Sequence, residues 1–259
     1  MIFLHGAGES QRGPNESYAC LRHGVPKIIL AYDKLMSGGE PAIDIPRPSR
    51  LRDRGPERGD NHSRASADLS KTPVPAAVCR AVAEEFVTLT PVLDLTNGYG
   101  WNDPVLTSLL DGVLPGLRVD PARVHATGFS MGGYGTWSLG LHTPDRFASL
   151  APVCGGGDVL RAGQLAHVPQ WVHHGELDDI IPVSESSKMV SALKKVGADV
   201  RFSRYPGLAH DSWTEAYNNI EFWEWMLENQ QDWEGVSKVL PDDDKVDTIE
   251  DINGSVTVI

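Results

Sequence analysis

The sequence predicts an α/β fold in which a mostly parallel sheet is covered by helices on both faces. Short apolar runs alternate along the chain with segments of helical periodicity, an order typical of repeated strand–helix units. The length of 259 residues and a hydrophobic content of 41% suffice for one large domain with a sizeable core. Buried strands are expected at Ile2–Leu4, Phe86–Leu89, Val124–Phe129, Leu150–Cys154, Gln170–His173 and Val200–Tyr205.

Helices are expected between and after these strands. The segment Ser184–Val196 places Met189 and Leu193 on one face and is followed by Gly197, a residue that often ends helices. The segment Glu215–Glu228 repeats apolar residues in steps of four, three and four, which predicts one continuous helix. Because strands and helices alternate, the functional residues should gather at the carboxyl ends of the strands.

Two segments differ in composition from the rest of the chain. Residues 37–73 contain 13 charged and only seven apolar residues, without helical or strand periodicity, which predicts a polar insertion without regular structure. Residues 234–259 carry seven acidic and two basic residues and are interpreted as an acidic tail. The remaining chain, 1–233, is expected to form the single folded domain.

Charge and composition argue against several classes of partner. The net charge of −12 argues against a protein that mainly binds nucleic acid, and no apolar run is long enough to span a membrane. The cysteines Cys20, Cys79 and Cys154 match no zinc-binding spacing, and their odd number argues against a disulfide framework. No signal peptide is recognisable, so we expect a cytoplasmic protein. The oligomeric state is not indicated.

The segment Gly128-Phe129-Ser130-Met131-Gly132 is the strongest functional signal. It follows an expected strand and precedes a helical pattern, which is the context of a nucleophile elbow. The tight turn requires flanking residues without a Cβ, and the serine would lie at a helix N-terminus that favours a developing negative charge. The alternative is an ordinary glycine-rich turn between a strand and a helix.

A nucleophilic serine needs a base and an acid. His210 is the preferred base among nine histidines because it lies in a loop after the last expected strand; His173 and His174 are interpreted as core or supporting residues. Asp178 is the preferred acid, with its neighbour Asp179 and also Asp158 as alternatives.

Donors for an oxyanion and an aromatic pocket can also be assigned. The backbone N–H groups of Met131 and of Ala7, in the loop His5-Gly6-Ala7-Gly8-Glu9, are the expected oxyanion donors, with Gly6 next. Trp101 and Trp213, together with Gly6, are expected to contact substrate, although simple packing explains both tryptophans equally well.

A set of motifs occurs in order and resembles a known family. They are His5-Gly6-Ala7-Gly8-Glu9, the segment Gly128–Trp137, Cys154-Gly155-Gly156-Gly157-Asp158, the segment His174–Asp179 and His210-Asp211-Ser212-Trp213. Together they resemble the phospholipase/carboxylesterase-like branch of the α/β-hydrolases, which includes feruloyl-esterase-like proteins and predicted peptidases. The resemblance covers roughly residues 1–35 and 77–228.

The resemblance implies an α/β-hydrolase fold and serine-dependent hydrolysis of a small-molecule carboxylic ester, without metal or organic cofactor. Its serine, aspartate and histidine correspond to Ser130, Asp178 and His210. Family members usually have further strands before the His-Gly loop, so N-terminal edge strands are expected to be missing here. The absence of an apolar lid helix favours small acyl or aryl esters. Thioester or peptide hydrolysis by the same residues, and a non-catalytic binding protein, are the alternative functions.

Overall fold

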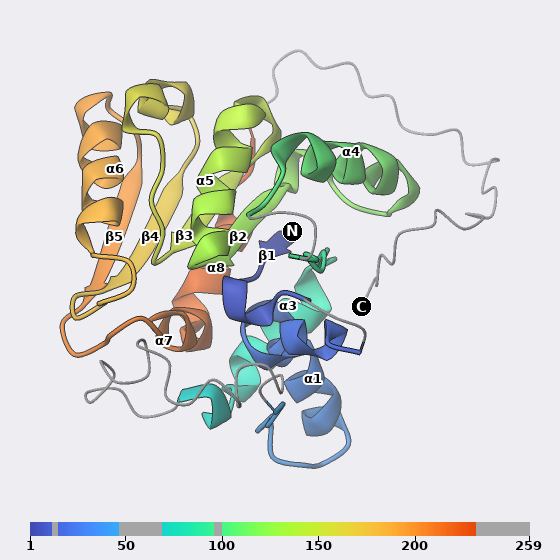
Figure 1. Ribbon diagram of the computed structural model, residues 1–259. Helices are drawn as coiled ribbons and strands as arrows, with labels where there is room; N and C mark the ends of the chain where they lie inside the picture. Colours follow the sequence, from blue (N-terminus) through green and yellow to red (C-terminus); the bar gives the residue numbers. More distant parts are fainter. Residues whose placement is uncertain (12–14, 47–68, 96–99, 232–259) are drawn as a thin grey trace.

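A five-stranded parallel sheet forms the centre of the part of the chain that the structure describes (Figure 1). The computed structural model describes residues 1–11, 15–46, 69–95 and 100–231. The strands lie side by side in the order of the sequence, and every neighbouring pair is parallel. They are β1 (Ile2–Leu4), β2 (His125–Phe129), β3 (Ser149–Val153), β4 (Gln170–Gly175) and β5 (Val200–Tyr205). The predicted parallel sheet is therefore confirmed.

Helices cover both faces of this sheet, as predicted. Side chains alternate between the faces along a strand, so Phe3 of β1 joins one buried cluster whereas Ile2 and Leu4 join the other. The helices on the Phe3 face are α1 (Gly24–Met36), α3 (Ala76–Glu85), α7 (Trp213–Asn218) and α8 (Ile220–Glu228). Those on the Leu4 face are α4 (Asp103–Val113), α5 (Met131–His142) and α6 (Ser184–Lys195).

The strand expected at Phe86–Leu89 is wrong, because this segment forms only an isolated parallel bridge between Leu89 and Ile2. The amide of Leu89 donates to the carbonyl of Met1 at 2.9 Å, and Leu89 O accepts from Phe3 N at 2.9 Å. The next donor in a parallel ladder would be residue 91, which is proline and has no N–H. The pairing therefore stops after one bridge along the outer edge of β1.

The continuous helix expected at Glu215–Glu228 is also wrong, because the chain breaks it at Asn219. This residue is extended, with φ −86° and ψ 118°, and separates α7 from α8. Its side chain accepts a hydrogen bond from the amide of Glu221 at 3.0 Å, so it caps the start of α8. By contrast, α6 ends where predicted, and Gly197 adopts a positive φ of 78° beyond it.

The described ends of the predicted insertion are attached to the helices of the Phe3 face. Lys27 of α1 donates to the carbonyl of Thr72 at 3.0 Å, and the amide of Val74 donates to the carbonyl of Pro41 at 3.0 Å. Lys71 pairs with Asp44 at 2.9 Å. The centre of the insertion, residues 47–68, and the predicted tail, 234–259, lie outside the described residues.

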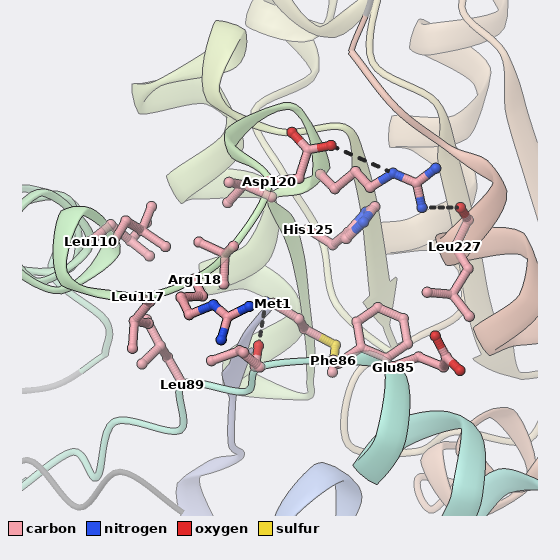
Figure 2. Close-up of a pocket in the computed structure, with 15 residues that line it drawn as sticks. Met1, Glu85, Phe86, Leu89, Leu110, Leu117, Arg118, Asp120, His125 and Leu227 are labelled. Carbon is pink, nitrogen blue, oxygen red and sulfur yellow. Dashed lines mark hydrogen bonds and ion pairs between the residues drawn. The ribbon is translucent and has the colours of Figure 1, made fainter. Parts of the chain in front are cut away.

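A cavity of about 220 Å³ lies at the amino ends of β1 and β2 (Figure 2). Its lining is mainly apolar and includes Phe86, Leu110, Leu117 and the buried His125. None of the described helices is long and apolar enough to cross a membrane.

Candidate active site

Ser130 lies in the sharp turn between β2 and α5. Its backbone, with φ 56° and ψ −119°, is one that non-glycine residues rarely adopt. A Cβ on either Gly128 or Gly132 would collide with the carbonyl oxygen of Leu4. The turn therefore tolerates no side chain at these two positions, and the predicted strand–turn–helix context of Ser130 is confirmed.

The structure brings Ser130, His210 and Asp178 together in a chain of hydrogen bonds. Ser130 Oγ lies 3.0 Å from His210 Nε2, and His210 Nδ1 lies 2.8 Å from Asp178 Oδ2. An ionised carboxylate can only accept, so Nδ1 carries the proton and Nε2 is left to accept the hydrogen of the Ser130 hydroxyl. The geometry is that of a serine paired with a base and a base held by an acid.

Backbone contacts between the loop after β4 and the loop after β5 hold Asp178 and His210 close together. Asp178 lies in the turn after β4 and His210 in the loop after β5. The amide of Leu177 donates to the carbonyl of Leu208 at 3.0 Å, close to both side chains. A Cβ on Gly175 would collide with the carbonyls of Leu208 and Ala209, so a glycine at the end of β4 lets the loops approach.

Asp178 is buried but remains the charged member of the site. Burial by itself raises the pKa of this carboxyl, but hydrogen bonds from His174 and His210 outweigh it and hold the pKa well below its usual range. The second oxygen, Oδ1, accepts from the amides of Ile180 and Ile181 at 3.0 and 2.9 Å. A carboxylate with this many donors is fixed in both position and charge.

The two alternative acids lie elsewhere. Asp179 is exposed, whereas its neighbour Asp178 is buried against His210. Asp158 is also exposed, and its side chain accepts from the amide of Leu160 at 3.0 Å at the start of a short 3-10 helix. Only Asp178 among the three candidates contacts His210.

His5 holds the loop after β1 in place through two hydrogen bonds. The amide of Ala7 in this loop lies at the start of a helix. His5 Nε2 accepts from the amide of Leu93 at 3.0 Å, so Nδ1 carries the hydrogen that goes to the carbonyl of Gly6 at 2.8 Å. Burial lowers the pKa of His5 to about 4, so the ring is neutral at pH 7. Ala7 begins a 3-10 helix and Met131 begins α5, and such first amides have no acceptor within their own helix.

A cleft of about 670 Å³ opens beside Ser130. Trp101 and Tyr134 are its aromatic wall residues, and Asp158 and Arg161 provide the charges. The indole nitrogen of Trp101 donates to the carbonyl of His5 at 3.2 Å, so this side chain links the cleft to the loop after β1.

Trp213 and Gly6 are not among the residues that line this cleft. Trp213 is only 9% exposed, stacks on Phe129 with ring centroids 4.4 Å apart and meets the ring of His210 edge-on at 5.2 Å. Trp213 therefore packs against the ring of His210 and supports it. A Cβ on Gly6 would lie 2.7 Å from the Phe129 ring and 2.8 Å from Glu9 Oε2, so the glycine is required by packing.

Three further residues near the site were not singled out by the sequence analysis. Tyr134 falls within the motif segment Gly128–Trp137 but was not assigned to the site, yet it lines the cleft. Cys154 is buried in a left-handed conformation with φ 39° at the end of β3. Glu9 is buried, which raises the pKa of its carboxyl to about 7 although Arg22, 3.9 Å away, opposes the shift. Its place at the end of the motif His5-Gly6-Ala7-Gly8-Glu9 was the only signal in the sequence.

Among the described residues, one group of potential metal-ligand atoms lies close together. The ligand atoms of Cys154, Asp178 and His210 all lie within 4.8 Å of one another. However, the His210 nitrogens and the Asp178 oxygen are committed to the hydrogen bonds described above. Burial also raises the pKa of the Cys154 thiol well above its usual value, which keeps the thiol protonated. The donor set fits a serine–histidine–aspartate chain better than a metal centre.

The chain is similar to known proteins over the part that contains this site. Residues 103–223 match the family model described as phospholipase/carboxylesterase, and this range contains Ser130, Asp178 and His210. A solved structure of a thermostable esterase matches with a TM-score of 0.59 and 26% identity, covering 89% of this chain and 54% of that one. The described part of the chain thus has the α/β-hydrolase fold.

The chain is also similar to parts of two curated proteins. It is 32% identical over 129 residues to NocK of Nocardia uniformis subsp. tsuyamanensis, a protein named as an esterase, covering 48% of this chain and 38% of NocK. It is 26% identical over 109 residues to acyl-protein thioesterase 1 of Gibberella zeae, covering 39% and 46% of the two chains. The matches thus span less than half the length of these curated relatives.

Proposed function

We propose that this α/β-hydrolase cleaves carboxylic esters, with Ser130 as nucleophile, His210 as general base and Asp178 as the residue that orients His210. The observation that carries the proposal is the chain of hydrogen bonds of 3.0 and 2.8 Å from Ser130 through His210 to Asp178. A serine hydroxyl is a weak nucleophile at neutral pH and becomes reactive when a base at this distance takes its proton. The match to the phospholipase/carboxylesterase family model and the likeness to a solved esterase support the same reaction.

The reaction proceeds through an acyl-enzyme. Ser130 Oγ bonds to the acyl carbon while its proton passes to His210 Nε2, and the bond to the alcohol oxygen then breaks as His210 returns the proton to the leaving alcohol. Water attacks the acyl carbon next, with His210 again taking a proton. The acid is released and His210 protonates Ser130 Oγ, which regenerates the starting state.

The oxyanion of each tetrahedral intermediate is assigned to backbone donors. The amides of Ala7 and Met131 are the proposed donors, and the amide of Gly6, the neighbour of Ala7, is the alternative to Ala7. Their separate origins, the loop after β1 and the start of α5, let two N–H groups converge on one oxygen. The positive end of α5 adds to the stabilisation of this charge.

The substrate proposed is a small acyl or aryl ester that lies in the cleft beside Ser130, against Trp101 and Tyr134. Trp213 is assigned to supporting His210 through its edge-on ring contact at 5.2 Å. The mechanism uses no metal or organic cofactor, and a cytoplasmic location is part of the same proposal.

Thioester hydrolysis is the second candidate, because one relative carries the name of an acyl-protein thioesterase. The same three residues would serve, since only the leaving group differs. A set of ester, thioester and amide substrates with one common acyl group distinguishes the reactions. We expect the ester to give the highest kcat/KM, and Ser130→Ala to lose this activity while remaining folded. Hydrolysis that persists in Ser130→Ala would refute the proposal, and no turnover of any substrate by the folded protein would favour a non-catalytic binding protein.

A further inference from the structure

Two adjacent histidines on β4 are fully buried and point to opposite faces of the sheet. His173 packs on the Phe3 face, where its Nδ1 lies 2.9 Å from the Tyr205 hydroxyl and its ring lies 5.3 Å from that of Phe222. His174 lies on the other side, beside Asp178. The mechanism above uses neither of them. His174 therefore lies beside Asp178 without a role in that mechanism.

The neighbours of His174 determine where its hydrogens lie. Its Nε2 is 2.8 Å from the carbonyl oxygen of Ile181 and 3.2 Å from Asp178 Oδ2. Neither of these oxygens carries a hydrogen, so Nε2 must be protonated and act as the donor. Its Nδ1 lies 2.7 Å from the Ser186 hydroxyl, which can either accept from or donate to it. Either arrangement leaves a hydrogen on Nε2.

These contacts attach the turn that carries Asp178 to the body of the protein. Ser186 belongs to α6, and its hydroxyl also lies 2.8 Å from the carbonyl of Gly155, which follows β3. His174 thus links α6 to both Asp178 and Ile181, while the amide of Ile181 donates back to Asp178 Oδ1 at 2.9 Å. Besides His210, the Asp178 carboxylate is therefore held by the His174 ring, which is itself fixed at both nitrogens.

We propose that His174 is a positioning residue for this active site, whose Nε2–H holds Asp178 and its turn in place for His210. This inference rests on the proposed function, because it assigns a role within the same site. Oδ2 of Asp178 faces two imidazoles, His210 Nδ1 at 2.8 Å and His174 Nε2 at 3.2 Å. Sharing one carboxylate oxygen reduces the negative charge that His210 experiences. Loss of the His174 donor should therefore strengthen the pairing of Asp178 with protonated His210.

The variant His174→Asn removes the donor at Nε2, because the shorter amide reaches Ser186 but not Asp178. His174→Gln places an amide N–H close to the former Nε2 position and is the conservative rescue. His173→Asn is the matched control, since it removes an equally buried imidazole from the adjacent residue of the same strand on the opposite face. Ser186→Ala is a second route to the same effect, because it leaves His174 in place but removes its anchor.

The first measurement is the titration of the His210 ring protons by NMR, which needs no substrate. In His174→Asn the midpoint of this titration should move to higher pH, with a smaller movement in His174→Gln and in Ser186→Ala and none in His173→Asn. Among the described residues, the other ionisable groups that face His210 are Glu9, Cys154 and Asp211, and they are the same in all these variants.

The second measurement is ester hydrolysis as a function of pH. In His174→Asn we expect kcat to fall about tenfold, because the stronger pairing of Asp178 with protonated His210 slows the return of the proton to the leaving alcohol. KM should be unchanged because His174 does not line the cleft. The acidic limb of the pH–rate profile should move to higher pH together with the NMR titration. A purely structural role would lower stability but leave both midpoints where they are.

The outcomes separate the two proposals. If the wild-type protein hydrolyses no ester, the proposed function fails, but the NMR titration still reports whether His174 acts on His210 through Asp178. If the titration of His210 is unchanged in His174→Asn, or moves equally in His173→Asn, the positioning role is overturned. If His174→Asn does not fold, Ser186→Ala decides by the same criterion.

Discussion

The two ends of the sheet both bury ionisable groups but affect their charges in opposite ways. At the carboxyl ends, four donors surround Asp178 at 2.8 to 3.2 Å and hold the pKa of its carboxyl below the usual range despite burial. At the amino ends, beside the cavity in Figure 2, burial lowers the pKa of His125 to about 3. Burial alone removes a charge, and only an arranged set of partners retains it.

Glu9 lies at the carboxyl ends of the strands, yet burial shifts its pKa toward the neutral form, as it does for His125 at the amino ends. Burial raises the pKa of its carboxyl to about 7, although Arg22 and His23 lie 3.9 and 3.7 Å from Oε1. The donors of Asp178 are closer by roughly one ångström. The difference shows that partner distance, more than location in the fold, decides which buried carboxyl stays charged.

Replacing the charged acid should have the largest effect. Asp178→Asn keeps the shape of the side chain but removes the negative charge that orients His210, so kcat should fall roughly 10³- to 10⁴-fold. The matched control is Asp179→Asn, an exposed neighbour that should stay within about twofold of wild type. Steady-state kinetics on one ester decide this, and an equal loss in both variants would contradict the assignment of Asp178.

The elbow should be the most sensitive point for stability. Gly132→Ala places a Cβ against the backbone carbonyl of Leu4, so we expect the free energy of unfolding to fall by roughly 3–5 kcal/mol. Gly112→Ala in α4 is the control, because no atom lies within 4 Å of its added Cβ. That helix should gain about 0.5–1 kcal/mol. Chemical denaturation measures both, and a stable Gly132→Ala protein would argue against the tight turn.

The pH dependence of stability should differ in sign between the two ends. The folded pKa of His125 is about 3 against an ordinary 6.5, so the unfolded chain binds the proton first and stability falls as pH drops from 6.5 toward 3. The folded pKa of Glu9 is about 7 against 4.5, so its contribution is present below pH 4.5 and is lost as pH rises to 7. Each such group changes the free energy of unfolding by up to about 1.4 kcal/mol per pH unit.

Unfolding measured from pH 4 to 7 in His125→Gln and Glu9→Gln tests these signs. The first variant should lose stability less steeply toward acid than the wild-type protein. The second should lose less stability toward neutral pH. The same change of slope in both variants would show that the two buried groups do not respond in opposite ways.

The smallest expected effect concerns the cleft. Trp101→Phe replaces the indole in the cleft wall with a smaller ring and removes the hydrogen bond of 3.2 Å to the carbonyl of His5. We expect KM for an aryl ester to rise about threefold with kcat nearly unchanged, since this contact would bind ground state and transition state alike. The kinetics of an acetyl ester of a small alcohol provide the comparison. The KM of this small substrate should change less than the KM of the aryl ester.

The sequence predicted those features that depend on local constraints. The glycines around Ser130 and the strand before it indicated the elbow, and the structure adds the physical reason in the Leu4 carbonyl. The order of Ser130, Asp178 and His210, each after a different strand of a parallel sheet, was enough to bring the three together. Parallel strands end at one edge, so residues far apart in sequence meet there.

Features that depend on tertiary contacts were not predictable in the same way. The strand expected at Phe86–Leu89 had the right composition, but Pro91 lacks the N–H that the next step of pairing requires. The apolar repeat from Glu215 to Glu228 continued across Asn219, whose capping of α8 breaks the helix. The role of His174 depends on Ser186 and Ile181, whose positions periodicity does not reveal.

The central claim is that His210 and Asp178 activate the hydroxyl of Ser130. Labelling of the purified protein with a fluorophosphonate, located by peptide mass spectrometry, tests it most directly, with Ser130→Ala and Asp178→Asn alongside. We expect one adduct on Ser130, none in Ser130→Ala and much slower labelling in Asp178→Asn. An adduct on another residue, or equal labelling rates in the wild-type protein and Asp178→Asn, would contradict the account.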